Sequence, residues 1–242
     1  MTRMHRVFTD QPLETGQSLS LIDERAHYLL RVLRAGVGQA VAVFNGDGAD
    51  YAARVVRLDR AAVTLQLGDV LAARAESPLH ITLVQAVSKG ERMDTSLQKA
   101  TELGASAFQP VFTARTEVRL QQGKLERRMD HWRKVIISAC EQSGRARIPD
   151  LRMPADLTTW AQQSSGAGRI VLVPGRASLT QVPVGQAIEL VVGPEGGLDD
   201  REVEFLEMKG TTAASLGPRI LRTETAGPAA IAILQSLAGD FR

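Results

Sequence analysis

A strand that ends in a cluster of glycines constrains this chain more than any other feature. Residues 188–192 form an apolar, largely β-branched run that is typical of a buried strand. The run stops at Gly193-Pro194-Glu195-Gly196-Gly197, where glycine lets backbone amides approach a ligand closely and adopt positive φ. Asp199 or Asp200 can then cap a helix. The pattern is that of a strand, a ligand-binding turn and a helix.

A second strand end of the same kind follows closely. The apolar residues 213–216 stop at Gly217-Pro218, and residues 219–225 then bring charged and hydroxyl groups together. Either junction alone is more often a simple connector, because Gly-Pro by itself signals only a turn. Taken together, the two junctions predict a ligand pocket at the carboxyl edge of a sheet.

Length and composition indicate a globular protein with one large or two ordinary domains, because 242 residues can bury a proper core. No apolar run approaches the roughly 20 residues that span a bilayer, and the N-terminus has no signal-peptide pattern. We therefore expect no membrane association and a cytoplasmic location. One cysteine and four scattered histidines indicate neither a disulfide nor a metal site.

Charge is unevenly distributed along the chain. Residues 86–152 contain thirteen basic and eight acidic residues, whereas residues 153–242 contain seven basic and ten acidic ones. A basic middle section suggests a polyanionic partner, although solvated basic helices are common and the excess is small.

The first 73 residues have the pattern of a small β-barrel or sandwich with one helix. The turn Asn45-Gly46-Asp47-Gly48 between two β runs predicts a hairpin. His27, Arg31 and Arg34 would share one face of the helix, which is either a solvated face or a phosphate-binding stripe. We expect a helix at 24–34, capped by Asp23, and strands at 3–8, 40–44, 51–58 and 62–67.

After a linker at 72–78, strands and helices alternate, which predicts a mostly parallel sheet with helices on both faces. The last helix, 225–237, is apolar almost all round, so it must be buried on more than one side, by the interior or by a second subunit. We expect strands at 79–87, 108–112, 169–173 and 188–192, and helices at 91–103, 124–143 and 156–164.

Several enzyme classes are disfavoured by missing motifs. The chain has no P-loop, no complete dinucleotide fingerprint and no nucleophile elbow. Cys140 lies within a predicted helix beside Ile136 and Ile137, where a packed core thiol is expected rather than a nucleophile. The polar segments 89–94 and 141–147 remain, either as solvated helix ends or as parts of a site.

Four ordered motifs carry a family resemblance: KGERMDTSLQKATELG, CEQSGRARIP, VVGPEGGLDDRE and LGPRILRTETA, preceded by HYLLRVLR. In this order and spacing they resemble the ribosomal small-subunit RNA methyltransferase E family, of the SPOUT superfamily of knotted methyltransferases. The similarity covers nearly the whole chain and is least distinctive at 150–185.

The resemblance implies a fold, a reaction and partners. It implies a PUA-like β-barrel RNA-binding domain at 1–73 and an α/β SPOUT domain at 78–242, with a parallel sheet and a C-terminal trefoil knot. It further implies a homodimer that uses S-adenosylmethionine to methylate N3 of one uridine in the decoding region of 16S rRNA, within an assembled small subunit.

The implied reaction needs a carboxylate to take the N3 proton or a guanidinium to stabilise the resulting anion. We expect Glu195 in the first role and Arg222 in the second, with Glu141, Arg219 and Glu224 in reserve. Glu195 is equally expected to be only an acid at a helix N-terminus. The predicted donor-binding residues are Leu172, Gly175, Gly193, Gly196, Leu216, Gly217, Ile220, Leu221 and Arg222. The predicted RNA contacts are Arg3, Arg6, Arg31, Arg34, Lys89, Arg92, Arg145 and Arg147.

Two alternatives stay open at this point. One is a SPOUT enzyme that methylates another RNA, such as a tRNA base or a ribose hydroxyl. The other is a non-catalytic RNA-binding assembly factor, which would not bind S-adenosylmethionine.

Overall fold

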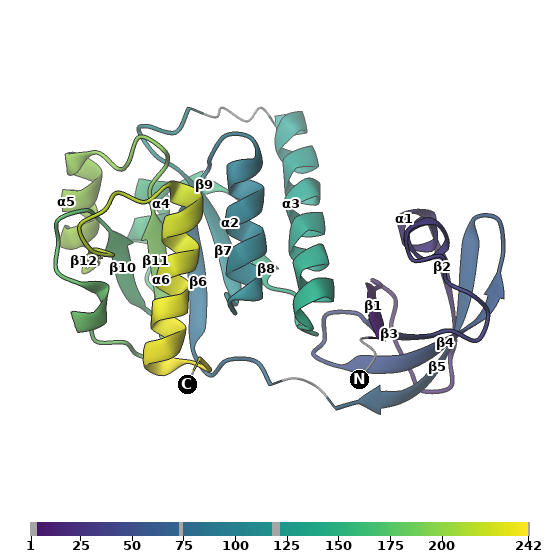
Figure 1. The fold of residues 1–242 in the computed structure, drawn as a ribbon. Helices are drawn as coiled ribbons and strands as arrows, with labels where there is room; N and C mark the ends of the chain where they lie inside the picture. Colours follow the sequence, from purple (N-terminus) through teal and green to yellow (C-terminus); the bar gives the residue numbers. More distant parts are fainter. Residues whose placement is uncertain (1–3, 73–74, 118–121, 242) are drawn as a thin grey trace. The chain divides into compact units, whose positions relative to one another are not determined.

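The protein consists of two compact units (Figure 1). The computed structural model describes residues 4–72, 75–117 and 122–241. The smaller unit is Met1–Glu76 together with Cys140–Ile148, and the larger unit is Ser77–Ala139 with Pro149–Arg242. The segment 140–148 thus joins a unit from which it is distant in sequence, which the sequence pattern did not indicate.

The smaller unit is built on a five-stranded half-barrel with the strand order β1-β3-β4-β5-β2. β1 and β3 are parallel, and the other neighbours are antiparallel. The predicted β3–β4 hairpin is confirmed, and its turn contains Gly46 and Gly48 at φ values of 94° and 106°. The strands are β1 (His5–Phe8), β2 (Ser18–Ile22), β3 (Ala40–Phe44), β4 (Asp50–Leu58) and β5 (Ala62–Leu71).

The predicted helix at 24–34 is present but is not a regular α-helix. α1 (Asp23–His27) runs directly into the π-helical turn η1 (Tyr28–Val32), in which the Leu33 amide donates to the Tyr28 carbonyl at 3.0 Å. Arg34 then adopts a positive φ of 49°. His27, Arg31 and Arg34 are all exposed, but the wider turn means that they do not follow α-helical spacing.

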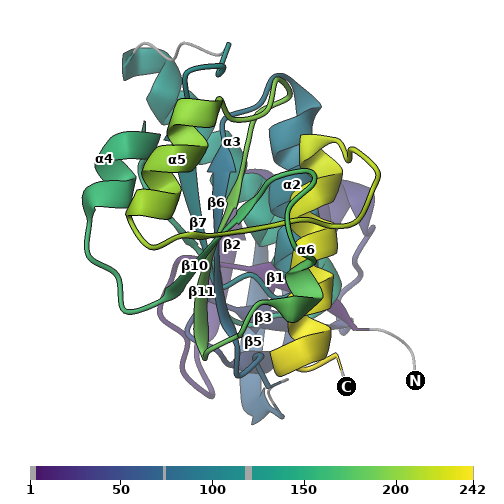
Figure 2. The same ribbon diagram turned by 90° about the vertical axis from the view of Figure 1, so that its left-hand side faces the viewer.

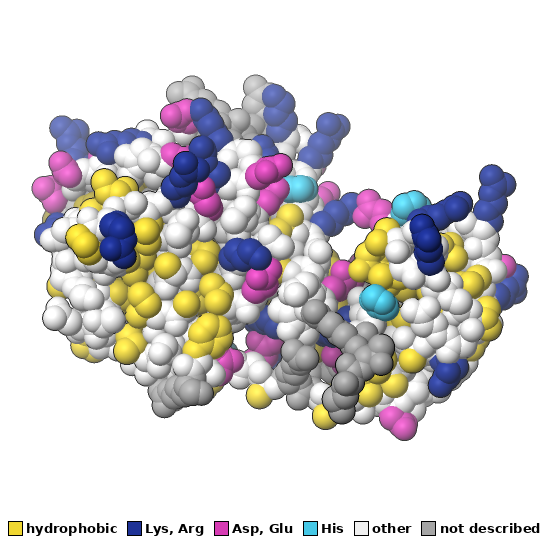
Figure 3. Space-filling model, in the orientation of Figure 1, with side chains coloured by type: hydrophobic (Ala, Val, Ile, Leu, Met, Phe, Trp, Pro, Cys, Tyr) yellow, Lys and Arg dark blue, Asp and Glu magenta, His cyan; other side chains and the backbone are white. Residues whose placement is uncertain are grey.

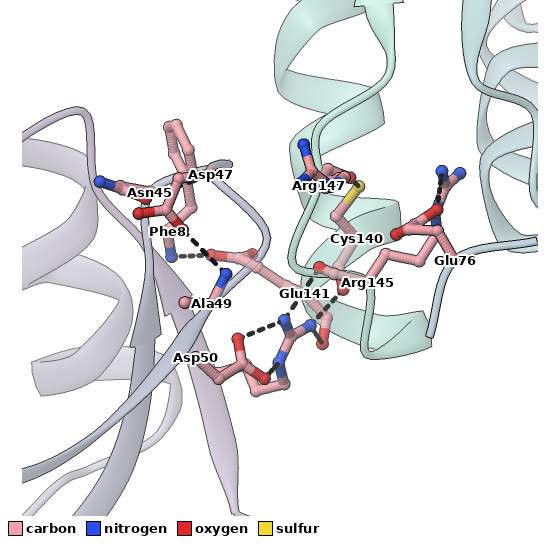
Figure 4. Close-up of polar contacts among 11 residues, drawn as sticks. Phe8, Asn45, Asp47, Ala49, Asp50, Glu76, Cys140, Glu141, Arg145 and Arg147 are labelled. Atoms are coloured by element: carbon pink, nitrogen blue, oxygen red, sulfur yellow. Dashed lines mark hydrogen bonds and ion pairs between the residues drawn. The ribbon is translucent and has the colours of Figure 1, made fainter. Parts of the chain in front are cut away.

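The segment 140–148 is held to the half-barrel by a buried arginine. The Arg6 guanidinium forms two hydrogen bonds with the Asp50 carboxylate, at 2.7 and 3.0 Å, and donates to the carbonyl of Arg145 at 2.9 Å. It also donates to the carbonyl of Cys140. Figure 4 shows how Glu141 lies beside Phe8, whose amide donates to its carboxylate at 3.0 Å. Only 11% of the Arg6 side chain is exposed, so its charge is compensated within the unit.

The larger unit contains the predicted parallel sheet, in the order β12-β10-β11-β6-β7-β8, with β9 also paired to β7. Every neighbouring pair is parallel. The carboxyl ends of the strands therefore lie along one edge of the sheet. The strands are β6 (His80–Ala86), β7 (Ala107–Phe112), β8 (Asp150–Leu151), β9 (Ala155–Asp156), β10 (Gly168–Leu172), β11 (Ala187–Val192) and β12 (Thr212–Ala214).

Helices cover both faces of this sheet, as expected from the alternating pattern. α2 (Glu91–Glu102) and α6 (Thr223–Ala238) lie on one face, and α4 (Leu157–Gln162) and α5 (Asp200–Met208) lie on the other (Figure 2). Successive residues of β6 point to opposite faces. Val84 packs in the cluster that contains Trp160 and Leu206, whereas Leu83 approaches Gly227 of α6. The remaining helices are α3 (Gln122–Ser143) and the short 3₁₀ turn η2 (Leu179–Gln181).

The last helix returns from the edge of the sheet to its centre. α6 follows the edge strand β12 but packs against β6, β11 and α2. Its buried Gln235 accepts a hydrogen bond from Ser77 at 2.6 Å and donates to the Leu103 carbonyl at 3.1 Å. Interior packing therefore buries one side of this apolar helix, while Leu237 remains 42% exposed. Within the described ranges, no helix combines the length and apolarity that crossing a membrane requires.

Candidate active site

A cavity of about 490 Å³ opens at the carboxyl edge of the parallel sheet. Its walls come from the ends of three neighbouring strands and the loops that follow them: residues 172–174 at the end of β10, residues 192–195, 197 and 198 at the end of β11, and residues 215–217 after β12. The start of α6 and Arg92 of α2 complete the lining. Both strand ends that the sequence analysis identified, at Gly193 and at Gly217, therefore line one cavity.

Gly193 has no room for a side chain. A Cβ atom built on Gly193 would lie 3.0 Å from the Leu198 backbone nitrogen and 3.2 Å from Leu198 Cγ. Gly197 closes the turn with a hydrogen bond from its amide to the Pro194 carbonyl at 2.9 Å, at a φ of 70°. Glycine at positions 193 and 197 therefore allows the loop to be compact.

A capping box fixes the helix that follows this loop. The Asp199 carboxylate accepts from the Glu202 amide at 2.8 Å, and the Asp199 amide donates to the Glu202 carboxylate at 3.0 Å. Of the two predicted caps, Asp199 is the one that the structure uses, because α5 begins at Asp200.

A buried polar chain connects the two glycine loops. Gln85, at the end of β6, donates through Nε2 to Thr223 Oγ1 at 2.8 Å, and Thr223 donates to the Gly193 carbonyl at 2.7 Å. Thr223 is the first residue of α6 and follows the loop that contains Gly217, whose φ is 99°. The loops at 193 and 217 are therefore fastened together, as the pocket hypothesis requires.

Arg115 holds the outer side of the 193–198 loop. This residue lies in the connection after β7, and its guanidinium donates to the carbonyls of Gly196 at 2.8 Å and Leu198 at 3.4 Å. The neighbouring Ala114 amide donates to the Glu202 carboxylate at 2.8 Å. No sequence motif pointed to Arg115, because its role depends on two segments that are distant in the chain.

The charged lining of the cavity consists of three arginines and two glutamates: Arg92, Arg219, Arg222, Glu195 and Glu224. The Arg222 side chain is 82% exposed and its Nη1 lies 4.0 Å from Glu224 Oε1. The excess of positive charge suits an anionic substrate at the mouth of the cavity.

Glu195 is engaged by neighbours rather than free to take a proton. Its Oε1 accepts from the Lys89 amide at 3.1 Å and from the Arg92 guanidinium at 2.9 Å. Partial burial raises the pKa of this carboxyl, but hydrogen bonds from its own amide, from Lys89 and from Arg92 together hold the pKa below its ordinary value. A carboxylate stabilised in this way is a weak base, so the geometry argues against the predicted role of Glu195 as proton acceptor. Instead, Glu195 positions Arg92.

Seven of the nine predicted donor-binding residues line the cavity: Leu172, Gly193, Leu216, Gly217, Ile220, Leu221 and Arg222. Gly175 and Gly196 lie outside this lining, and donor binding by either glycine remains a prediction. A Cβ on Gly175 would meet no atom within 4 Å, and the residue has a φ of 79° that favours glycine. The Gly196 carbonyl is occupied by Arg115.

Two of the predicted RNA contacts, Arg6 and Arg145, have mostly buried side chains. The Arg6 guanidinium is committed to Asp50 and to backbone carbonyls, as described above. Arg145 is 12% exposed and pairs with Glu76 at 2.6 Å, also within the smaller unit. Neither charge is presented to solvent, so neither is assigned to RNA. Arg3 lies outside the described residues.

The other predicted RNA contacts remain accessible. Arg31, Arg34 and Arg147 have exposed side chains in the smaller unit. Lys89 pairs with Glu117, and Arg92 is the residue that binds Glu195 in the cavity lining. Figure 3 shows Lys and Arg side chains gathered over the upper part of the larger unit, where α6 begins in Figure 1. Glu141, held in reserve for catalysis, belongs to the smaller unit and does not line the cavity.

Known families match both parts of the chain. Residues 75–235 match the RNA methyltransferase domain family, and residues 21–68 match the RNA methyltransferase PUA domain. The fold and the site thus define an RNA methyltransferase that carries an N-terminal PUA domain. The chain is 30% identical to the ribosomal RNA small subunit methyltransferase E of Buchnera aphidicola, over 99% of this chain and 96% of that protein. It belongs to the ribosomal RNA small subunit methyltransferase E family.

Two solved structures share the fold closely. The ribosomal RNA small subunit methyltransferase E of Neisseria gonorrhoeae, bound to S-adenosylmethionine, is 37% identical, with a TM-score of 0.95 over 99% of this chain and 100% of that one. A protein from Legionella pneumophila, in complex with the same cofactor, is also 37% identical, with a TM-score of 0.96 and the same coverage. These neighbours confirm the predicted SPOUT-type α/β fold with its N-terminal PUA domain.

Proposed function

We propose that this protein methylates N3 of one uridine in the decoding region of 16S rRNA, with S-adenosylmethionine as the methyl donor. The observation that carries the proposal is the cavity, because three loops of the RNA methyltransferase domain converge on it. The two solved neighbours bound to S-adenosylmethionine support the choice of donor. The choice of base and position rests on the motif resemblance.

The residues of the cavity fit this donor. Its volume lies within the range of small-molecule sites, about 300–1,000 Å³, and its loops leave backbone groups accessible beside glycine. S-adenosylmethionine bound there would supply a methyl group on a positively charged sulfur. The residues that would hold it are the seven predicted ones that line the cavity.

Arg222 is placed to stabilise the substrate anion. Uridine N3 becomes nucleophilic when its proton leaves, and the resulting charge spreads to the neighbouring carbonyl oxygens. A guanidinium at the mouth of the cavity can bind those oxygens, and the Arg222 side chain in the cavity lining is 82% exposed. We expect Arg222→Ala to lower turnover by about a hundredfold or more, the usual scale for one electrostatic group.

The matched control for that variant is Arg176→Ala. Arg176 is exposed, pairs with Glu207 at 3.3 Å and does not line the cavity. Its replacement should leave methylation of small subunits unchanged. Near-normal turnover of the Arg222 variant would remove that residue from the mechanism.

Substrate recognition must make the Watson–Crick edge of the base accessible. The target uridine therefore has to be unpaired or turned out of its helix. Aromatic residues make up only 4% of the chain, so we infer that phosphate contacts by arginine dominate binding. Arg31, Arg34 and Arg147 in the smaller unit, with Lys89 and Arg92 in the larger one, are the proposed contacts. Binding that does not weaken with salt would contradict this.

We also propose that the protein acts as a homodimer on an assembled small subunit in the cytoplasm. An outward apolar surface supports a second copy: Ile220 is 86% exposed and Leu237 is 42% exposed, at the two ends of the α6 region. Figure 3 shows hydrophobic side chains over the same part of the larger unit. Analytical ultracentrifugation that finds only monomers at micromolar concentration would refute the dimer.

The family resemblance further implies a trefoil knot at the C-terminus, which we retain as a proposal. The return of α6 from the edge strand β12 to the centre of the sheet, past η2, supports it. Tracing the chain in an experimental structure would test the threading.

The central test is a complementation experiment with nucleoside analysis. Small subunits from a strain that lacks this gene should contain no 3-methyluridine at the decoding site, and added protein with S-adenosylmethionine should restore it. Loss of a different RNA modification would favour another target. Failure of calorimetry to detect S-adenosylmethionine binding would favour a non-catalytic assembly factor.

A further inference from the structure

One glutamate in the cavity wall has a carboxylate oxygen with no hydrogen-bond donor among the described residues. Glu224 lies in the first turn of α6 and lines the cavity, and its side chain is 17% exposed. Its Oε2 atom is buried and accepts no hydrogen bond. The nearest cation, Arg222, lies 4.0 Å from the other carboxylate oxygen. A buried acceptor left without a donor has a free-energy cost, which is larger when the acceptor is charged. Such a cost is typical of a group that serves a ligand.

Glu224 and Glu195 are the two carboxylates of the lining, and they differ in their hydrogen bonding. Glu195 accepts from the Lys89 amide and from Arg92, at 3.1 and 2.9 Å. Glu224 has a buried oxygen with no donor. A proton acceptor needs a lone pair that is free before the substrate binds. The geometry therefore favours Glu224 over Glu195 for proton transfer.

The position of Glu224 is fixed by its neighbour in the chain. Thr223 donates to the Gly193 carbonyl at 2.7 Å and accepts from Gln85 at 2.8 Å, so the first turn of α6 is tied both to the cavity loop and to β6. The other charged residues of the cavity lining are Arg92, Arg219, Arg222 and Glu195. The carboxylate is thus positioned mainly by the attachment of its backbone, because its ion pair with Arg222 is long, at 4.0 Å.

We propose that Glu224 Oε2 accepts the N3 proton of the target uridine, an assignment that rests on the proposed function. The N3–H bond breaks and its proton bonds to Oε2. The electron pair left on N3 forms the bond to the incoming methyl carbon, whose bond to sulfur breaks with its electron pair retained by sulfur. Arg222 balances the transient charge on the uridine oxygens, and the proton on Glu224 leaves to solvent through the cavity mouth.

The test begins with the wild-type protein and small subunits from cells that lack the modification. Wild-type protein should produce 3-methyluridine, detected by nucleoside mass spectrometry. Glu224→Gln keeps the shape of the side chain but cannot take the proton. We expect the single-turnover rate to fall by about 10²–10⁴-fold, the usual contribution of a general base. The control is Glu204→Gln, an exposed acid of α5 outside the cavity, which should react at the wild-type rate.

Two further measurements separate proton transfer from a structural role. Subunits from cells grown with 5-fluorouracil carry 5-fluorouridine, whose N3 proton is more acidic and needs less help to leave. The Glu224→Gln variant should therefore recover a larger share of the wild-type rate on these subunits. Its melting temperature should equal or exceed that of the wild-type protein, because the substitution removes a carboxylate charge whose buried oxygen has no hydrogen-bond donor among the described residues.

Each outcome decides the assignment. Equal rate loss on both kinds of subunit, or a lower melting temperature, would show a structural role and overturn it. A loss of S-adenosylmethionine affinity measured by calorimetry would show that the carboxylate holds the donor, which also overturns it. A wild-type protein that leaves N3 unmethylated would refute the proposed function itself, and the two failures are thus distinguishable.

Discussion

Two glycines three residues apart in the cavity loop should respond differently to the same substitution. A Cβ at Gly193 would lie 3.0 Å from the Leu198 backbone nitrogen, a contact that forces the loop to shift. A Cβ at Gly196 would lie 3.5 Å from the Arg115 side chain, which is ordinary van der Waals contact. Neither glycine has a positive φ, so alanine is permitted by the backbone at both positions and only the space differs.

The magnitude follows from the cost of overpacking. Forcing one extra carbon into a packed site costs about 1–3 kcal/mol. The Gly193 carbonyl is held by Thr223 at 2.7 Å, so the loop cannot relieve the contact on that side without losing a hydrogen bond. If the strain raises the free energy of the donor-bound protein, each 1.4 kcal/mol lowers the affinity for S-adenosylmethionine about tenfold. Gly193→Ala should therefore weaken S-adenosylmethionine binding by about tenfold to a hundredfold.

The assay is isothermal titration calorimetry of both variants with S-adenosylmethionine, accompanied by thermal melts. Gly196→Ala is the matched control and should bind like the wild-type protein. The sequence predicted a donor contact at Gly196, and this pair of variants tests that prediction against the steric reasoning. Equal affinities for the two variants, or weaker binding by Gly196→Ala, would refute the steric reasoning.

Three other predictions concern groups outside the cavity. Arg115→Ala removes the hydrogen-bond donor to the Gly196 and Leu198 carbonyls. Because one exposed charge-assisted hydrogen bond contributes about 1 kcal/mol, this variant should bind S-adenosylmethionine about fivefold more weakly by calorimetry, and Arg115→Lys should recover part of the loss. Unchanged binding would show that these hydrogen bonds do not hold the loop in its donor-binding conformation. Burial raises the pKa of Glu141 above its ordinary value of 4.5, so the folded protein binds this proton more tightly and loses stability as pH rises through that window. Glu141→Gln, which can still accept from the Phe8 amide, should match the wild-type melting temperature in acid and exceed it at neutral pH; a gain that is the same at every pH would refute this sign. Burial also raises the pKa of the Cys140 thiol to about 12, so iodoacetamide at pH 8 should label it only when the protein unfolds; rapid labelling of the native protein, followed by mass spectrometry, would show otherwise.

The fold was largely predictable because its signals are periodic and local. The alternation of strands and helices predicted the parallel sheet, and the Asn-Gly and Asp-Gly steps at 45–48 predicted the β3–β4 hairpin. The strand β2 was missed, although its residues alternate between exposed and buried, because five residues beside a helix signal give a weak pattern. The π-helical turn at Tyr28–Val32 has no sequence signature that distinguishes it from an α-helix.

The parts of the site that depend on backbone conformation were predictable from the sequence. The parts that depend on side chains from distant segments were not. Glycine breaks after two strands located the cavity to within a few residues. The partners of charged side chains could not be read from local sequence: Arg6 was expected on the surface yet pairs with Asp50, and Glu195 was expected to be free yet binds Arg92. Arg115 and Gln85 act through contacts across the chain, which no local motif encodes.

The membership of residues 140–148 in the smaller unit has a practical consequence for dissecting the protein. A fragment that ends at residue 76 would contain every strand of the half-barrel but would strip Arg6 of three main-chain acceptors and Phe8 of its carboxylate partner. Of the five hydrogen bonds that the Arg6 guanidinium forms in the full protein, only the two to Asp50 would then remain. RNA-binding work on an isolated N-terminal piece would therefore report on a damaged molecule, and a faithful version needs the 140–148 peptide restored, in trans or through a short covalent tether.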